Sequence, residues 1–81
     1  MYVQYGYRAQ QALGLLPLDV KQRITDKISF FADQENLYQF AKYISIYKMY
    51  RFKVGDYRVF FKIIHRTLWI VGIERRDKAY D

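Results

Sequence analysis

The sequence contains no cysteine, one histidine, one proline and four glycines in 81 residues. The lack of cysteine excludes disulfides and thiolate metal ligands. A zinc site needs several converging His or Cys ligands, so a lone histidine argues against one, and we expect no metal or other cofactor. No apolar run reaches the ~20 residues that span a bilayer, and the first residues, MYVQYGYR, lack the features of a signal peptide. We therefore expect a soluble, cytoplasmic protein.

The chain is short, apolar and rich in aromatic residues. Residues 1–81 make one domain, because this length leaves no room for a second. With 52% hydrophobic residues, the chain is too apolar to be disordered. Nine tyrosines, six phenylalanines and one tryptophan favour strands and can also stack on bases, although most should pack in the core.

The positive charge is confined to the second half of the chain. Residues 1–40 carry four cations and four acids, whereas residues 41–81 carry ten cations and four acids. This asymmetry indicates that the second half meets a polyanion, most plausibly a nucleic acid. A basic surface that only confers solubility is the simpler alternative.

The residue pattern predicts an α+β fold. YVQY at 2–5 reads as a strand, 7–16 as a helix that Pro17 ends, and 20–31 as a second helix capped by Asp19. Residues 37–45 are either a short helix or an irregular approach to the sheet. Residues 47–54, 57–64 and 68–73 form a three-stranded antiparallel meander. The two-helix hairpin should pack on one face of this twisted antiparallel sheet.

The stretch RFKVGDYRVFFKI at 51–63 predicts a β-hairpin with a Gly55-Asp56 turn of type II′. The two-residue turn sets the register, in which Lys53 faces Arg58 and Arg51 faces Phe60. Like charges that face each other weaken a sheet. These residues, together with Lys62, form either the solvated face of the sheet or a cationic platform that holds phosphates. The tail adds Arg75, Arg76 and Tyr80 at one end of the sheet.

YRFKVGDYRVFFKI, followed by a β run and IERRDKAY, resembles the RelE/ParE superfamily of toxin–antitoxin toxins, and YRAQQALGLLPLDVKQRITDKISFF is similar to its helical hairpin. The resemblance is closer to the RelE-like branch. That branch implies an endoribonuclease that cleaves messenger RNA on the ribosome without a metal and so inhibits translation. It also implies a toxin that is monomeric alone and forms a hetero-oligomer with its cognate antitoxin. The ParE-like branch implies an inhibitor of DNA gyrase.

The resemblance also implies a set of site residues. The candidate catalytic residues are Arg51, Arg58, Arg76 and Tyr80. The candidate RNA-binding residues are Lys48, Lys53, Lys62, Arg75 and Lys78. One position departs from the family pattern, because Arg75 stands where many relatives have a histidine, and arginine cannot act as a general base near neutral pH. Either Tyr80 takes that role, or catalysis is mainly electrostatic, or the chain is a decayed toxin that only binds its antitoxin. His65 belongs to a surface turn and is no substitute.

Overall fold

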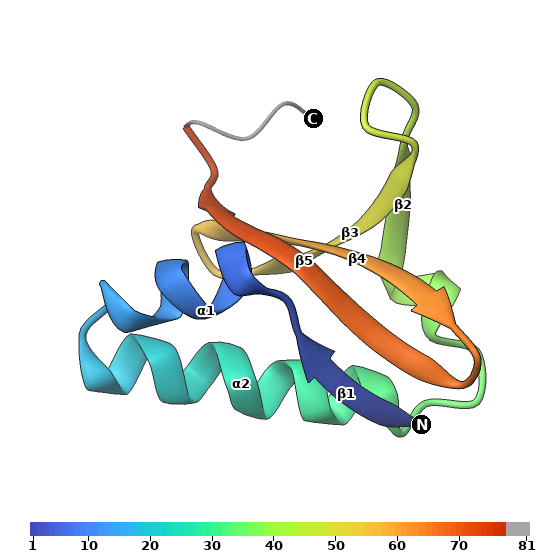
Figure 1. Cartoon of the computed structure of the whole chain (residues 1–81), viewed down its shortest axis with the longest axis horizontal. Helices are drawn as coiled ribbons and strands as arrows, with labels where there is room; N and C mark the ends of the chain where they lie inside the picture. The colour runs from blue at the N-terminus through green and yellow to red at the C-terminus, as the bar shows by residue number, and fades with distance from the viewer. Residues whose placement is uncertain (78–81) are drawn as a thin grey trace.

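The computed structural model describes residues 1–77 and has an α+β fold, as the sequence predicts. Helices α1 and α2 cover one face of a five-stranded sheet with the order β1-β5-β4-β3-β2 (Figure 1). The elements in chain order are β1 (Tyr2–Tyr5), α1 (Tyr7–Gly14), α2 (Leu18–Ala32), the 3-10 helix η1 (Leu37–Phe40), β2 (Ala41–Ile44), β3 (Met49–Val54), β4 (Tyr57–Ile64) and β5 (Thr67–Arg75).

The first strand makes the sheet mixed. β1 pairs in parallel with β5, with Val3 opposite Leu68 and Tyr5 opposite Ile70, whereas all other neighbours are antiparallel. A parallel pair needs a long connection between its strands. The whole α1–β4 segment supplies it here. The earliest residues of the chain therefore lie beside the last strand.

The ambiguous segment at 37–45 is a helix followed by a strand. η1 ends at Phe40, and β2 then pairs with β3, with Lys42 opposite Arg51 and Ile44 opposite Met49. The meander therefore has four strands instead of the expected three. Ala41 lies beside Phe52 and packs against the core under the helices, whereas the buried Ile44 lies on the opposite face, beside Met49.

The start of α2 differs from the prediction. The helix begins at Leu18 after Pro17, and no side chain caps it, so Asp19 is not the cap. Asp19 instead lies in the first turn, where a carboxylate faces the positive end of the helix dipole. Ile24, Ile28 and Phe31, which are spaced so as to share one side of the helix, are buried against the sheet.

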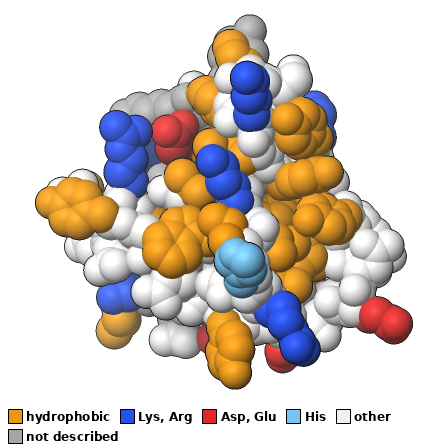
Figure 2. Space-filling model, turned by 45° about the vertical axis from the view of Figure 1, so that its right-hand side comes forward, with side chains coloured by type: hydrophobic (Ala, Val, Ile, Leu, Met, Phe, Trp, Pro, Cys, Tyr) orange, Lys and Arg blue, Asp and Glu red, His pale blue; other side chains and the backbone are white. Residues whose placement is uncertain are grey.

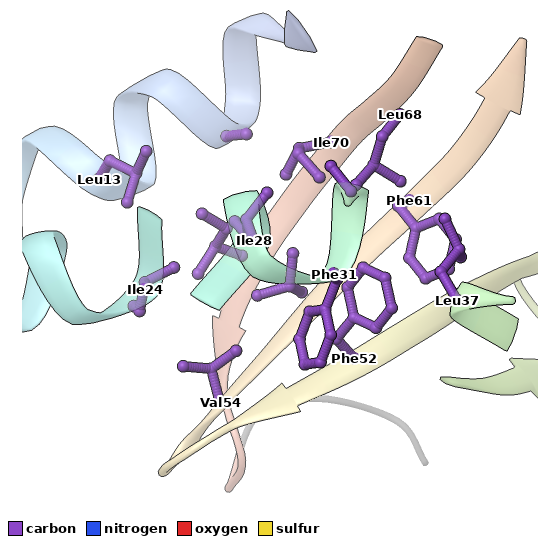
Figure 3. Close-up of a cluster of buried hydrophobic side chains, with 14 residues drawn as sticks. Leu13, Ile24, Ile28, Phe31, Leu37, Phe52, Val54, Phe61, Leu68 and Ile70 are labelled. Atoms are coloured by element: carbon purple, nitrogen blue, oxygen red, sulfur yellow. The ribbon is translucent and has the colours of Figure 1, made fainter. Parts of the chain in front are cut away.

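The core lies between the helices and the sheet (Figure 3). Phe52 stacks between Phe31 of α2 and Phe61 of β4, with ring centroids 4.1 Å apart in both pairs. Phe52 and Phe61 belong to the apolar face that the predicted hairpin register assigns to the core. Full burial of each such ring contributes roughly 1.5–3 kcal/mol.

The β3–β4 hairpin has the register predicted from its turn. Lys53 faces Arg58, Phe52 faces Val59 and Arg51 faces Phe60. Gly55 has φ +58°, and Asp56 is not among the residues with positive φ, as a type II′ turn requires. Within residues 1–77, no helix has the length and apolar character needed to cross a membrane.

Candidate nucleic-acid interface

The face of the sheet that points away from α1 and α2, here called the open face, carries two rows of facing residues. The first row runs across three strands and contains Lys53 of β3, Arg58 of β4 and Glu74 of β5. Arg58 therefore has a like charge on one side and an opposite charge on the other. Facing side chains lie about 5 Å apart at Cβ, so Glu74 offsets the repulsion that the hairpin alone would create.

The second row lies next to the first and is half cationic, half apolar. It contains Lys42 of β2, Arg51 of β3, Phe60 of β4 and Gly72 of β5. Arg51 and Arg58 occupy diagonal positions on β3 and β4, a separation of roughly 7–8 Å between Cα atoms. The two rows thus place Lys42, Arg51, Lys53 and Arg58 on one patch.

Burial divides these cations into two kinds. Only 6% of Arg51 and 6% of Arg58 is exposed, whereas Lys42 and Lys53 are exposed. The expectation of a solvated cationic face therefore holds for the two lysines and is wrong for the two arginines. Buried charges are tolerated when they are paired, and both arginines have interaction partners in the structure. Their guanidinium groups are consequently held in place instead of sampling many rotamers.

The end of β5 brings Arg76 to the β3–β4 turn. The Arg76 backbone N–H donates to the Asp56 carbonyl oxygen at 2.6 Å. Arg75, in contrast, is exposed and forms an ion pair with Asp77, with Nε 3.4 Å from Oδ1. The predicted site residues Lys78 and Tyr80 lie outside the described residues. Arg76 and Arg58 therefore share one end of the sheet.

Two predicted RNA-binding lysines lie farther from Arg58. Lys48 is in the turn between β2 and β3, and Lys62 faces Trp69 toward the other end of β4. Lys62 is four positions from Arg58 along β4, a distance of about 13 Å between Cα atoms. Figure 2 shows the region of the β4–β5 turn, where basic side chains lie among hydrophobic ones around His65, the histidine of the chain. His65 is exposed, as predicted for a surface turn.

Sequence reasoning missed Lys42 and Glu74. Lys42 was not identified as a site residue because its strand, β2, was not predicted. Glu74 was not identified because β5 has a β-bulge, in which Val71 is the extra residue opposite the Phe60–Phe61 step of β4. Counting from the β4–β5 turn without a bulge would set Ile73 opposite Arg58 and would leave Glu74 on the wrong face. A bulge inserts one residue into a strand and so changes which face later residues occupy.

The open face can bind and polarise a phosphodiester. Arginine forks bind phosphate oxygens in a bidentate manner, and exposed lysines act as point charges along the nucleic-acid backbone. Among residues 1–77, no group of three or more His, Cys, Asp or Glu side chains is arranged to hold a metal ion.

The chain is similar in fold to the toxins of two solved complexes. One is the RelBE2 toxin–antitoxin complex from Mycobacterium tuberculosis, with a TM-score of 0.74 and 19% identity over 93% of this chain and 96% of the other. The second is the archaeal RelE–RelB complex from Pyrococcus horikoshii OT3, with a TM-score of 0.69 and 20% identity over 96% and 97% of the two chains. At this identity, the likeness concerns the fold.

The sequence also matches a protein-family model, whereas no curated protein matches it. The model describes the ParE toxin of the type II toxin–antitoxin system parDE, and the match extends over residues 6–80. It therefore includes both helices, all strands after β1 and both rows of the open face. The chain belongs to the ParE toxin family of type II toxin–antitoxin systems, within the RelE/ParE superfamily.

Proposed function

We propose that this toxin is an endoribonuclease that cleaves messenger RNA on the ribosome and thereby inhibits translation. The observation that supports this proposal best is the pair of rows on the open face, which group Lys42, Arg51, Lys53 and Arg58. The similarity of its fold to those of the two RelE–RelB-type complexes is a second observation that supports the proposal.

The proposed reaction is an internal transesterification. The 2′-oxygen of one nucleotide attacks the adjacent phosphorus while a base takes its proton. The bond from phosphorus to the 5′-oxygen then breaks, and the leaving oxygen receives a proton. The products are a 2′,3′-cyclic phosphate and a 5′-hydroxyl end.

The arginines of the open face stabilise the transition state of this reaction. Negative charge grows on the non-bridging oxygens, and fixed cations stabilise it because they need no reorganisation. Arg58 and Arg51 fit this role because they are buried and held. Arg76 lies at the same end of the sheet, and Lys53 contacts a backbone phosphate. Tyr80 is the candidate for proton transfer, since Arg75 cannot act as a general base.

Mapping of RNA ends in cells after induction tests this function. Wild-type toxin should create new cuts in translated messages, in phase with codons. Arg58→Ala should remove these cuts and the growth inhibition while the protein stays folded. Lys21→Ala is the control, because it removes an exposed cation from α2, on the helical side of the sheet. A folded Arg58→Ala protein that is fully toxic would contradict the proposal.

A second candidate function is inhibition of DNA gyrase. The match of residues 6–80 to the ParE toxin model favours it. A supercoiling assay with purified gyrase and micromolar toxin distinguishes the two functions. Inhibition of supercoiling without RNA cuts would replace the first proposal with this one.

The proposed protein partner is a cognate antitoxin that binds the toxin and neutralises it. Both similar solved structures are toxin–antitoxin complexes. An acidic segment would suit the cationic open face. Co-expression with the neighbouring small gene, followed by affinity purification, should recover a stable hetero-oligomer and should suppress the growth inhibition.

A further inference from the structure

A cavity of about 560 Å³ adjoins the two rows of the open face. Arg8 of α1, Tyr47 of the β2–β3 turn, and Phe60, Gly72 and Glu74 of the sheet are among its lining residues. Its size is within the range of ligand sites, roughly 300–1,000 Å³. Glu74 faces Arg58 directly, so the cavity begins one residue from the proposed phosphate site.

One side of the cavity is aromatic. The rings of Tyr47 and Phe60 meet edge to face, with centroids 5.3 Å apart and planes at 86°. Tyr47 is 38% exposed, which leaves ring surface for a ligand. Aromatic rings next to a cationic groove are typical of sites where a nucleobase stacks beside its backbone.

The floor of the cavity is open because of a glycine. A Cβ atom added at Gly72 would meet nothing within 4 Å, and the bulge at Val71 lies beside it. Bulges redirect neighbouring side chains and are common next to active sites. The open space above Gly72 can therefore receive a flat ring.

The polar groups of the cavity define which ring fits. An ionised carboxylate such as that of Glu74 only accepts hydrogen bonds, through two oxygens. Guanine offers it two adjacent donors, N1–H and N2–H, whereas the edges of the other bases offer at most one donor group beside an acceptor. Arg8, from α1, supplies donors for acceptor atoms such as guanine O6 and N7.

We propose that this cavity is a nucleobase pocket that selects guanine next to the scissile phosphate, with Glu74 as the specificity-determining residue. The inference rests on the proposed ribonuclease function, because it names the base that this activity prefers. RNA-binding proteins read unstacked bases in this way, by stacking on aromatic side chains and bonding to the base edge.

The first experiment maps cut sites in cells for four proteins. Wild type should show guanine beside the cut in about tenfold excess over the other bases, as one bidentate contact allows. Glu74→Gln should bring this preference close to parity, and Gly72→Val should lower cutting at all sites because it fills the cavity. Glu35→Gln, which changes an exposed acid in the loop after α2, should cut like wild type.

The second experiment measures binding without cleavage. Full-length toxin labelled with ¹⁵N is titrated with the 5′-monophosphates of guanosine, adenosine, cytidine and uridine. Guanosine monophosphate should shift the amide signals of Phe60, Gly72 and Glu74 at lower concentration than the other three, and Glu74→Gln should remove that difference. Retained spectral dispersion shows that each variant is folded.

The two experiments separate the pocket from the proposed function. Guanosine-selective shifts without any RNA cuts would uphold the pocket and overturn the ribonuclease. Cuts whose guanine preference survives in Glu74→Gln would uphold the ribonuclease and overturn the pocket. The pocket is also overturned if no mononucleotide shifts these amides.

Discussion

Arg58 faces Lys53 on one neighbouring strand and Glu74 on the other, and it is almost fully buried. A cation in that position is shielded from solvent, so its interactions are screened less than those of the exposed lysines. The repulsion from Lys53 costs a few tenths to about 1 kcal/mol, and Glu74 offsets it from the other side. Glu74 therefore lowers the cost of placing Arg58 beside Lys53.

Conservative exchanges should therefore act differently at Arg58 and Lys53. Arg58→Lys keeps the charge and loses the planar fork, so we expect messenger RNA cleavage to fall at least about tenfold. Lys53→Arg adds a fork at an exposed position and should keep activity within about twofold. Single-turnover cleavage on programmed ribosomes measures both. Equal effects of the two exchanges would contradict a special role for the Arg58 fork.

Tyr5 gives the protein a pH dependence of stability. Burial raises the pKa of the Tyr5 hydroxyl above the ordinary value of about 10. The folded state therefore holds this proton at a pH where the unfolded state releases it, and the free energy of unfolding falls as pH rises above about 10. Tyr5→Phe should make this fall shallower. Urea unfolding between pH 8 and 11 measures it, with Tyr2→Phe on the same strand as the matched loss of a hydroxyl.

At the scale of elements, the β3–β4 and β4–β5 turns of the meander differ in how well their residues suit the backbone conformation. Gly55 supplies the positive φ of the β3–β4 turn, whereas His65 and Arg66 adopt φ of 48° and 63° in the β4–β5 turn. Two positive φ values define a type I′ turn, which favours Asn-Gly. Left-handed conformations cost roughly 1–2 kcal/mol for residues with a Cβ. The β2–β3 turn has one such residue, Lys48 with φ 55°, so the β4–β5 turn, with two in succession, carries the most backbone strain of the three turns.

Replacing both residues of that turn should stabilise the fold. His65→Asn combined with Arg66→Gly should raise the free energy of unfolding by about 1 kcal/mol, and the Tm by roughly 4–8 °C. Thermal unfolding followed by circular dichroism measures the change. An unchanged or lower Tm would show that the turn residues contribute contacts that outweigh their strain.

Replacing glycine by alanine should affect the free energy of unfolding differently at Gly55 and at Gly72. Gly55→Ala puts a Cβ on a left-handed residue and should lower stability by about 1 kcal/mol. Gly72→Ala adds a Cβ into open space on a strand without that strain, and should leave stability unchanged or raise it by about 0.5 kcal/mol. Denaturant midpoints of the two variants provide the comparison. Similar losses in both would contradict the difference in backbone conformation.

The register of the β3–β4 hairpin was predictable because a two-residue turn leaves no freedom in pairing. The core positions Phe52, Val59 and Phe61 followed from it. The bulge at Val71 was not predictable, because nothing in the local pattern of LWIVGI distinguishes a regular strand from one with an extra residue. The four-residue β2 was not predictable either, since its pairing with β3 decides its conformation.

The candidate site was predictable in part. The sequence pattern identified Arg51, Lys53 and Arg58 as neighbours on one face, and the structure places them so. The sequence pattern did not indicate that the two arginines are buried. Alternation of residues along a strand assigns each residue to a face, whereas burial depends on what covers that face. The cavity beside them brings together α1, the β2–β3 turn and β5, which are distant in sequence. Such a site appears only when the chain is folded.

At the scale of the whole molecule, the charge asymmetry of the sequence becomes an asymmetry of faces. The open face holds cations from β2, β3 and β4, all in the basic half of the chain. Counterions gather along nucleic-acid backbones, and each contact between a cation and a phosphate releases one of them. Binding of RNA to this face should therefore depend steeply on salt concentration.

The salt dependence provides a count of phosphate contacts. For a single-stranded RNA blocked by 2′-O-methylation, Lys53→Ala should reduce the slope of log K against log salt by about 0.7, the value for one lost contact. Lys21→Ala, on the exposed side of α2, should leave the slope unchanged. Fluorescence anisotropy between 50 and 300 mM salt, roughly the accessible range, measures both slopes. An unaltered slope in Lys53→Ala would remove this lysine from the interface.

The parallel pair of β1 with β5 has a consequence for the order in which the toxin is made. Ribosomes synthesise β1 before β5, so residues 2–5 have no partner strand until residues 67–70 have been made. Glu74, which flanks Arg58, arrives with that same last strand. A nascent or prematurely terminated chain therefore lacks both the closed sheet and the complete first row. The ribosome must therefore complete β5 before a protein that is proposed to attack translation can assemble its site.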